Sequence, residues 1–105
     1  MLLKKMSERR REKKITKTEE RISKSQNDEE KERLLIELGR LKEKKGDFDG
    51  AIRAIIERLE ISMSNETFEE LIDICGKVDD SIRHAFSKEI ARFAGEFNDC
   101  RWERM

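Results

Sequence analysis

Apolar residues recur every three or four positions along residues 28–45, which is the spacing of one face of an α-helix. The segment opens with helix-starting signals, because Asn27 is a good N-cap and Glu30 stands three residues later, as in a capping box. Its last turn is rich in lysine, which suits the negative end of a helix, and Gly46 then allows a left-handed exit. The pattern predicts a helix over about 28–45, with an apolar face formed by Leu34, Leu35, Leu38 and Leu41.

A second helix is predicted directly after Gly46. Asp47 can cap it, and the small side chains of Ala51 and Ala54 allow it to lie close to its neighbour. Because the connection is so short, the two helices are expected to form an antiparallel hairpin. The apolar positions of this second helix again follow helical spacing and are Phe48, Ala51, Ile52, Ile55, Ile56 and Leu59.

The C-terminal half continues the helical pattern. After a break at residues 62–65, a shorter helix is expected to pass through Phe68 and to stop at Gly76. The next helix is expected to begin near Asp79 or Asp80, to be interrupted at Gly95, and to be followed by the start of a last helix over 97–105. Its apolar side would consist of Ile82, Phe86, Ile90, Phe93 and Phe97. No segment carries a strand pattern, so the fold class is predicted to be all-α, built on antiparallel helix hairpins.

The first 26 residues differ from the rest and are predicted to be a basic charged arm or helix, followed by a helical segment over 27–105. Residues 1–24 contain ten Lys or Arg against four Glu, although the whole chain has no net charge. Their apolar residues are too few to bury a face, so a frayed helix or a disordered arm is expected. The basic residues that could form a nuclear-import signal or contact phosphates are Lys4, Lys5, Arg9, Arg10, Arg11, Lys13 and Lys14. A solvated charged helix is the other interpretation.

Catalysis has little support in the sequence. His84 is the one histidine, and Cys75 and Cys100 match no metal or redox spacing. The acidic pairs at 69–70 and 79–80 are expected to be helix caps and solvated faces, and no glycine-rich phosphate loop is present. The chain is therefore expected not to be an enzyme and to use no cofactor or metal. With 46% charged residues, no membrane-length apolar run and two unpaired cysteines, it is expected to be intracellular, in the cytoplasm or the nucleus.

The stretch from about Glu32 to Asn65 resembles a tetratricopeptide (TPR) repeat, a helix pair that stacks with its neighbours. The residues at the characteristic spacings of that family are Leu35, Leu38, Gly39, Gly46, Asp47, Phe48, Ala51 and Leu59. In such a repeat Gly39 would allow a close helix crossing, and Phe48 with Ala51 would pack back onto the first helix. Departures are Leu41 and Lys42 where an aromatic is common, Arg58 in place of a usual alanine, and no closing proline.

The C-terminal residues match a second repeat less closely. Gly95 is expected to mark its turn, because Phe97 and Cys100 reproduce the pairing of Phe48 with Ala51. Residues 80–94 would then be the first helix of that repeat, and residues 65–78 an inserted helix. The segment would be incomplete at its C-terminus, with the apolar face of its last helices open. More distantly, the basic leading helix followed by residues 27–30 and the first repeat resembles the amino-terminal repeats of Tonsoku-like scaffold proteins of chromatin and DNA repair.

The resemblance implies a protein-interaction scaffold whose concave groove binds a peptide or a partner helix. The groove residues expected on the first repeat helix are Arg33, Ile36, Arg40, Glu43 and Lys44, with the arginines bonding acidic groups. The alternatives are a nuclear chromatin- or nucleic-acid-associated protein that uses the basic arm, and a homo-oligomer that assembles through exposed C-terminal helices. The groove residues also have a simpler interpretation, namely that they are charges that face solvent and bind no partner.

Overall fold

The computed structural model describes residues 2–97 of the chain, and the side chains of residues 9–97. This part of the chain folds into six α-helices and contains no strand, so the predicted all-α class is confirmed. The helices are α1 (Leu2–Lys24), α2 (Asp28–Lys45), α3 (Phe48–Ile61), α4 (Asn65–Cys75), α5 (Asp80–Ala85) and α6 (Ser87–Glu96). No described helix has an apolar stretch of the length that a lipid bilayer requires.

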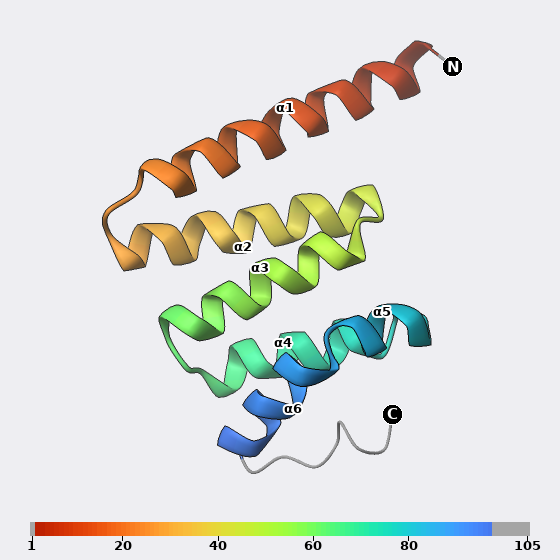
Figure 1. The fold of residues 1–105 in the computed structure, drawn as a ribbon. Coiled ribbons are helices and arrows are strands. Elements are labelled where there is room, and N and C mark those ends of the chain that lie inside the picture. Colours follow the sequence, from red (N-terminus) through yellow and green to blue (C-terminus); the bar gives the residue numbers. More distant parts are fainter. Residues whose placement is uncertain (1, 98–105) are drawn as a thin grey trace.

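Helices α1 to α4 lie side by side in chain order, and each runs antiparallel to the one before it (Figure 1). Helices α5 and α6 pack beside α4, at the opposite end of the stack from α1 (Figure 1). The Cα positions extend over 46 × 35 × 19 Å. The molecule is therefore a flat stack with α1 at one edge.

The α2–α3 hairpin follows the sequence prediction closely. The side chain of Asn27 accepts a hydrogen bond from the Glu29 N–H at 2.8 Å, and Asp47 accepts one from the Gly50 N–H at 2.9 Å. Each bond satisfies an N–H group that the first turn of a helix leaves without a backbone partner. Between the two helices Gly46 adopts the left-handed conformation, with φ of 87°. The predicted helix bounds, caps and hairpin are thus confirmed.

The apolar side chains form two clusters on either side of α3. The larger cluster joins α3, α4 and α6, and its most buried members include Ile52, Leu71 and Ile90, each with no exposed surface. The Phe97 ring extends this cluster by stacking on Phe68, with ring centroids 5.0 Å apart. The smaller cluster joins α1, α2 and α3 through Ile15, Leu35, Leu38 and Ala54. Helix α3 is the element that both clusters share.

Helix α1 is an ordered layer of the stack, so the expectation that its apolar residues cannot bury a face is wrong. Ile15 and Thr18 are buried and Ile22 is half-buried against α2. Their spacing of three and four residues places them in one narrow strip along α1. This strip is enough to bury one side of α1 because α2 contributes leucines to the same contact. The Thr18 hydroxyl donates to the Lys14 carbonyl oxygen at 2.7 Å, so its burial leaves no polar atom unpaired.

An ion pair joins α1 to the C-terminal end of α2. The Lys45 Nζ donates to Glu12 Oε1 at 2.5 Å, and this hydrogen bond lowers the pKa of the Glu12 carboxyl. Glu12 lies in the middle of α1, whereas Lys45 is the last residue of α2. The first turns of α1 therefore extend beyond the end of α2 (Figure 1).

Helix α4 takes the next place in the stack after α3, so residues 65–78 are not an insertion. The connection after α3 is only three residues long, which places α4 antiparallel beside α3. Its side chains at Phe68, Leu71 and Cys75 are among the most buried of the described residues. The helix is thus central to the core.

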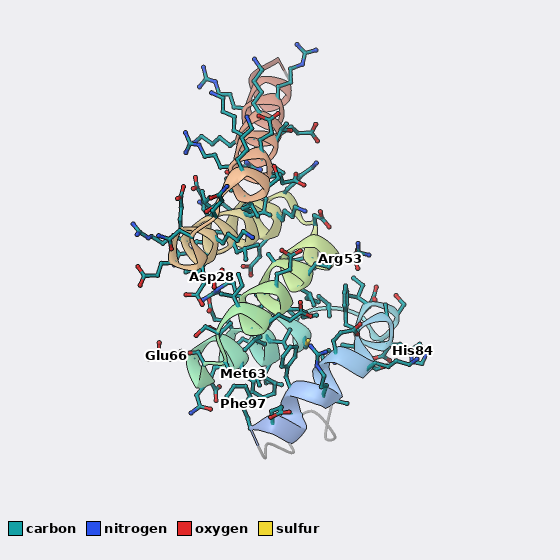
Figure 2. The ribbon with its side chains drawn as sticks, turned by 60° about the vertical axis from the view of Figure 1, so that its left-hand side comes forward. Asp28, Arg53, Met63, Glu66, His84 and Phe97 are labelled. Atoms are coloured by element: carbon teal, nitrogen blue, oxygen red, sulfur yellow. The ribbon has the colours of Figure 1, made fainter. Side chains whose placement is uncertain are left out.

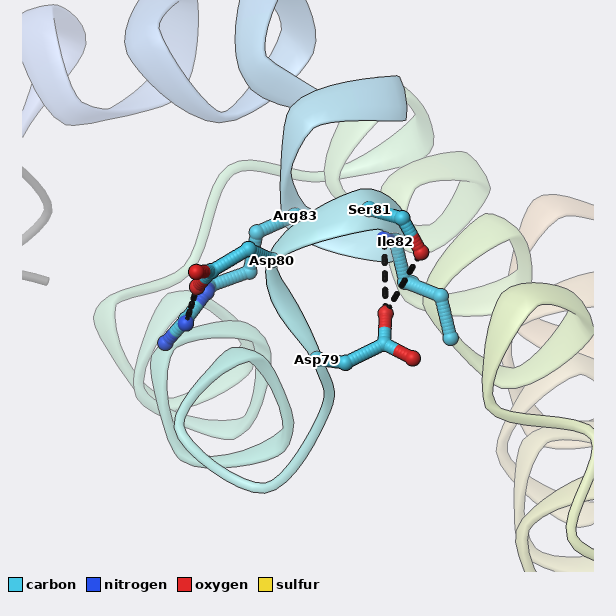
Figure 3. Close-up of polar contacts among 5 residues, drawn as sticks. All are labelled: Asp79, Asp80, Ser81, Ile82 and Arg83. Atoms are coloured by element: carbon cyan, nitrogen blue, oxygen red, sulfur yellow. Dashed lines mark hydrogen bonds and ion pairs between the residues drawn. The ribbon is translucent and has the colours of Figure 1, made fainter.

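The single helix expected over 80–94 is divided in two at Phe86, and Gly95 does not interrupt it. Asp79 caps α5 by accepting a hydrogen bond from the Ile82 N–H at 3.1 Å, beside the Asp80–Arg83 ion pair (Figure 3). No residue of α5 is fully buried, although the half-buried Ile82 packs against the larger cluster, and α6 begins after Phe86 enters the core. Helix α6 runs through Gly95 to Glu96. The last helix expected over 97–105 lies beyond the described residues, apart from Phe97.

Candidate functional site

A small cleft lies where α2, α3 and α4 meet. Its volume is about 40 Å³, which suits one small side chain and is far below the several hundred Å³ of a typical metabolite site. The residues that line it are Leu35, Ile36, Gly39, Arg40 and Glu43 from α2, Ala51, Ile55 and Arg58 from α3, and Glu70 and Ile74 from α4. The two outer helices form its sides and α3 forms its base.

The cleft combines an apolar base with charged walls. Leu35, Ala51, Ile55 and Ile74 are buried, and their side chains belong to the two core clusters. Ile36 is half-buried, so part of its side chain faces solvent at the cleft. An apolar group that enters here would lie against side chains of both core clusters.

Two ion pairs lie at the charged walls. Arg58 donates to Glu70 Oε2 at 2.8 Å, and only 12% of the Arg58 side chain is exposed. A second guanidinium nitrogen of Arg58 donates to Thr67 Oγ1 at 3.4 Å. On the opposite wall Lys77 Nζ lies 3.8 Å from Glu43 Oε1. These contacts compensate three of the four charged groups of the cleft within the chain itself.

Arg40 is the remaining charged group of the cleft. It is exposed, and no ion pair joins it to another residue in the described part of the chain. Its guanidinium can therefore offer its donors to a carboxylate that comes from outside.

The structure brings three of the five predicted groove residues together, namely Ile36, Arg40 and Glu43. Arg33 is exposed on the same side of α2, two turns before Arg40, but does not line the cleft. Lys44 is exposed and also lies outside the cleft. The cleft thus contains the three middle residues of the predicted set, and the first and the last lie outside it.

Sequence reasoning missed the contributions of α3 and α4. Arg58 departs from the TPR pattern, and in the structure its charge is paired with Glu70 on α4. The signal available in the sequence was an arginine on the apolar side of one predicted helix and an acidic pair on the next. Ile74 had no such signal, because its position depends on how α4 packs.

Two wider hollows lie elsewhere on the surface. One, of about 390 Å³, separates α3 from α5 and α6 and is lined by Arg53, Ile56, Glu57, Glu60, Ala85, Phe86 and Glu89. At its edge the Arg53 guanidinium lies 5.8 Å from the Phe86 ring centroid. The other, of about 470 Å³, adjoins the α1–α2 connection and is lined by Arg21, Lys24, Ser25, Gln26, Asn27 and Glu30.

The predicted basic residues of the arm all lie on α1. Arg9, Arg10, Arg11, Lys13 and Lys14 are exposed, whereas the side chains of Lys4 and Lys5 lie outside the described set. Side chains that end in nitrogen project from this helix into solvent (Figure 2).

The candidates for chemistry lie at the end of α4, at the cap of α5 and on α5 itself. Cys75 is fully buried, and burial raises the pKa of its thiol to about 11. His84 is exposed on α5 and points away from the stack (Figure 2). Asp79 is a helix cap, and hydrogen bonds from the Ser81 hydroxyl and the Ile82 N–H hold the pKa of its carboxyl below the usual value. Within residues 2–97, no group of three or more His, Cys, Asp or Glu is placed to hold a metal ion.

No protein-family model matches this chain, and comparisons with curated proteins and with solved structures returned no match.

Proposed function

We propose that this chain is a protein-interaction module of the TPR-like kind, which binds a peptide or a partner helix at the α2–α3–α4 cleft and acts by binding alone. The observation that carries the proposal is the combination of a preformed apolar base with one arginine, Arg40, that has no ion-pair partner among the described residues. A rigid receptor loses little conformational entropy on binding, so a shallow site of this kind can still bind a partner. The free thiol of Cys75 supports a reducing, intracellular setting, in the cytoplasm or the nucleus.

The cleft chemistry defines the partner. Its volume accepts a single apolar side chain, and Arg40 beside it calls for a carboxylate next to that side chain. Arg33 lies seven residues before Arg40, which corresponds to about 10 Å along the helix axis. A second carboxylate about 10 Å from the first would therefore reach Arg33. The expected ligand is an acidic segment with one apolar anchor.

The proposal can be tested with a random-peptide library displayed on phage and selected against the full-length chain. Enriched peptides should carry one apolar residue flanked by Asp or Glu. A synthetic copy of an enriched peptide should shift the backbone NMR signals of α2 and α4 around Ile36, Arg40 and Ile74. Arg40→Glu should weaken its binding by at least about tenfold, since an attractive charge contact becomes repulsive.

Lys88→Glu is the matched control, because Lys88 is exposed on α6 and lies outside the cleft. It makes the same change in net charge and should leave peptide binding unchanged. Equal weakening by the two variants would show that only overall charge matters, and the cleft would then not be the binding site.

A further inference from the structure

Six exposed cations of α1 form a continuous stripe, which we define as Arg10, Lys13, Lys14, Lys17, Arg21 and Lys24. At 3.6 residues per turn, these six positions fall within an arc of about 100° around the helix axis. No other residue of 9–24 falls within that arc. All six are exposed, and the stripe runs for about 21 Å along α1.

The acidic residues of α1 lie outside this stripe. Glu12 is on the side that meets α2, where it pairs with Lys45. Helical geometry places Glu19 on the same side as Glu12, and Glu20 just outside the edge of the stripe. No ion pair links any stripe residue to another residue of the described part of the chain. Six of the cations of α1 thus share one side of the helix, and that side is turned to solvent.

The stripe lacks what a protein partner or a membrane would need. A protein interface depends on apolar or aromatic side chains that become buried, and the arc contains none between residues 9 and 24. A helix that lies on a membrane inserts an apolar face, but Ile15 and Ile22 of α1 are already packed against α2. A row of cations without apolar anchors matches a polyanion, whose phosphates require charge alone.

Duplex DNA fits these features better than a single strand or duplex RNA. No aromatic residue is present in α1, so there is no platform on which unpaired bases can stack. The major groove of B-form DNA is wide enough to admit an α-helix, whereas the major groove of A-form RNA is too narrow. The first turns of α1 also extend beyond α2, so this end of the helix can approach a duplex unhindered (Figure 1).

We propose that the α1 stripe binds the phosphate backbone of double-stranded DNA without reading its sequence. Lys and Arg would replace the counterions condensed on the duplex, so affinity should fall steeply with salt. This inference is independent of the peptide cleft, because the stripe shares no residue with it.

The test is fluorescence anisotropy of the full-length chain with a labelled mixed-sequence DNA duplex of roughly 12 base pairs, about twice the length of the stripe at 3.4 Å per pair. Titrations are repeated between about 50 and 200 mM salt. Lys13→Gln with Lys17→Gln should lower affinity at least about tenfold and make the logarithmic salt slope shallower by about 1.8, or 0.9 for each lost phosphate contact. Both lysines are exposed, so circular dichroism should show unchanged helix content.

The matched control is Lys44→Gln with Lys88→Gln, which removes the same charge from exposed positions outside α1. It should keep the parent affinity and slope. Equal effects of the two double variants, or no binding of the parent chain at about 50 mM salt, would overturn the proposal. Tighter binding to the single strand, to an RNA duplex of the same sequence or to poly-glutamate would overturn it too, and poly-glutamate would indicate an acidic protein partner.

Discussion

Two glycines of the α2–α3 hairpin differ in what a larger side chain would meet. A Cβ at Gly39 would lie 3.7 Å from the Ala54 Cβ, which is an ordinary van der Waals distance. A Cβ at Gly50 would lie 2.6 Å from both Asp47 Oδ2 and Lys42 Cδ. A side chain at position 50 would therefore force the side chains of Asp47 and Lys42 to shift, which disturbs the cap of α3. The close crossing at Gly39, which the TPR resemblance implies, has space for one more methyl group.

Alanine should have opposite effects at these positions. Gly39→Ala should raise the free energy of unfolding by about 0.5–1 kcal/mol, because alanine favours the helix interior over glycine. Gly50→Ala should lower it by about 1 kcal/mol, because the new methyl group displaces the Asp47 cap. Urea denaturation followed by circular dichroism measures both values. A loss of stability in Gly39→Ala would show that α2 and α3 cross more closely than described.

The buried thiol of Cys75 makes stability depend on alkaline pH. Its pKa is raised from 9.0 to about 11, so above pH 9 the unfolded chain loses this proton while the folded chain keeps it. The contribution of Cys75 is therefore fully present below pH 9 and is lost as pH rises towards 11, by at most about 1.4 kcal/mol per pH unit. Cys75→Ala should show a shallower decline than the parent chain when denaturation is measured at pH 8 to 11. Parallel declines would contradict this assignment.

At the scale of elements, the sequence predicted α2, α3 and α4 because each carries a dense apolar stripe and a clear end signal. Asn27, Gly46 and Asp47 act locally, so their roles can be read without the tertiary structure. The order of α1 depends instead on a tertiary contact, the packing of its few apolar residues against the leucines of α2. The break at Phe86 likewise depends on the surface that α3 and α4 present.

The candidate site likewise contains residues that helical periodicity can group and residues that only the packing of the helices brings together. Ile36, Arg40 and Glu43 share one side of a single helix, and helical periodicity is enough to group them. Arg58 and Glu70 meet only because α4 follows α3 directly, and periodicity within one helix contains no information on that contact.

The seam between α1 and α2 gives an element-level prediction. Ile15→Ala should lower the free energy of unfolding of α1 by about 2 kcal/mol, because the residue is buried in the smaller cluster. Amide hydrogen exchange should then become faster along α1 and stay slow along α4, since α4 belongs to the larger cluster. Glu19→Ala changes an exposed residue of the same helix and serves as the control. Equal acceleration in α1 and α4 would show that the whole stack unfolds as one unit.

At the scale of the whole molecule, the larger cluster contains the apolar residues that the sequence analysis expects to form an open C-terminal face. Phe86, Ile90 and Phe93 are buried against α3 and α4 within one chain. Among the residues with described side chains, Met63 is the exposed large hydrophobic, with 46% of its surface accessible. For the helices described, which end before Phe97, the expectation of an apolar face open to self-association is therefore wrong.

Phe93→Asp should consequently destabilise the fold rather than separate two copies. A buried carboxylate without a partner, together with the lost ring, should cost at least about 3 kcal/mol. Ala91→Asp places the same charge at an exposed position of α6 and should have little effect. Thermal denaturation measures the stability of each variant, and sedimentation velocity measures its mass. A well-folded Phe93→Asp variant with half the mass of the parent would instead restore the oligomer hypothesis.

The charged side of α1 also determines the direction in which this stack can grow. Helical arrays lengthen where an apolar face is available to receive the next layer. Beyond α1 such a layer would have to bury Lys13, Lys17 and Arg21 without counter-charges, which costs more than a helix contact returns. The addition of a further layer at the α1 edge is therefore disfavoured. Two molecules that approach each other through their α1 edges repel each other electrostatically, so a dimer formed through this edge is disfavoured.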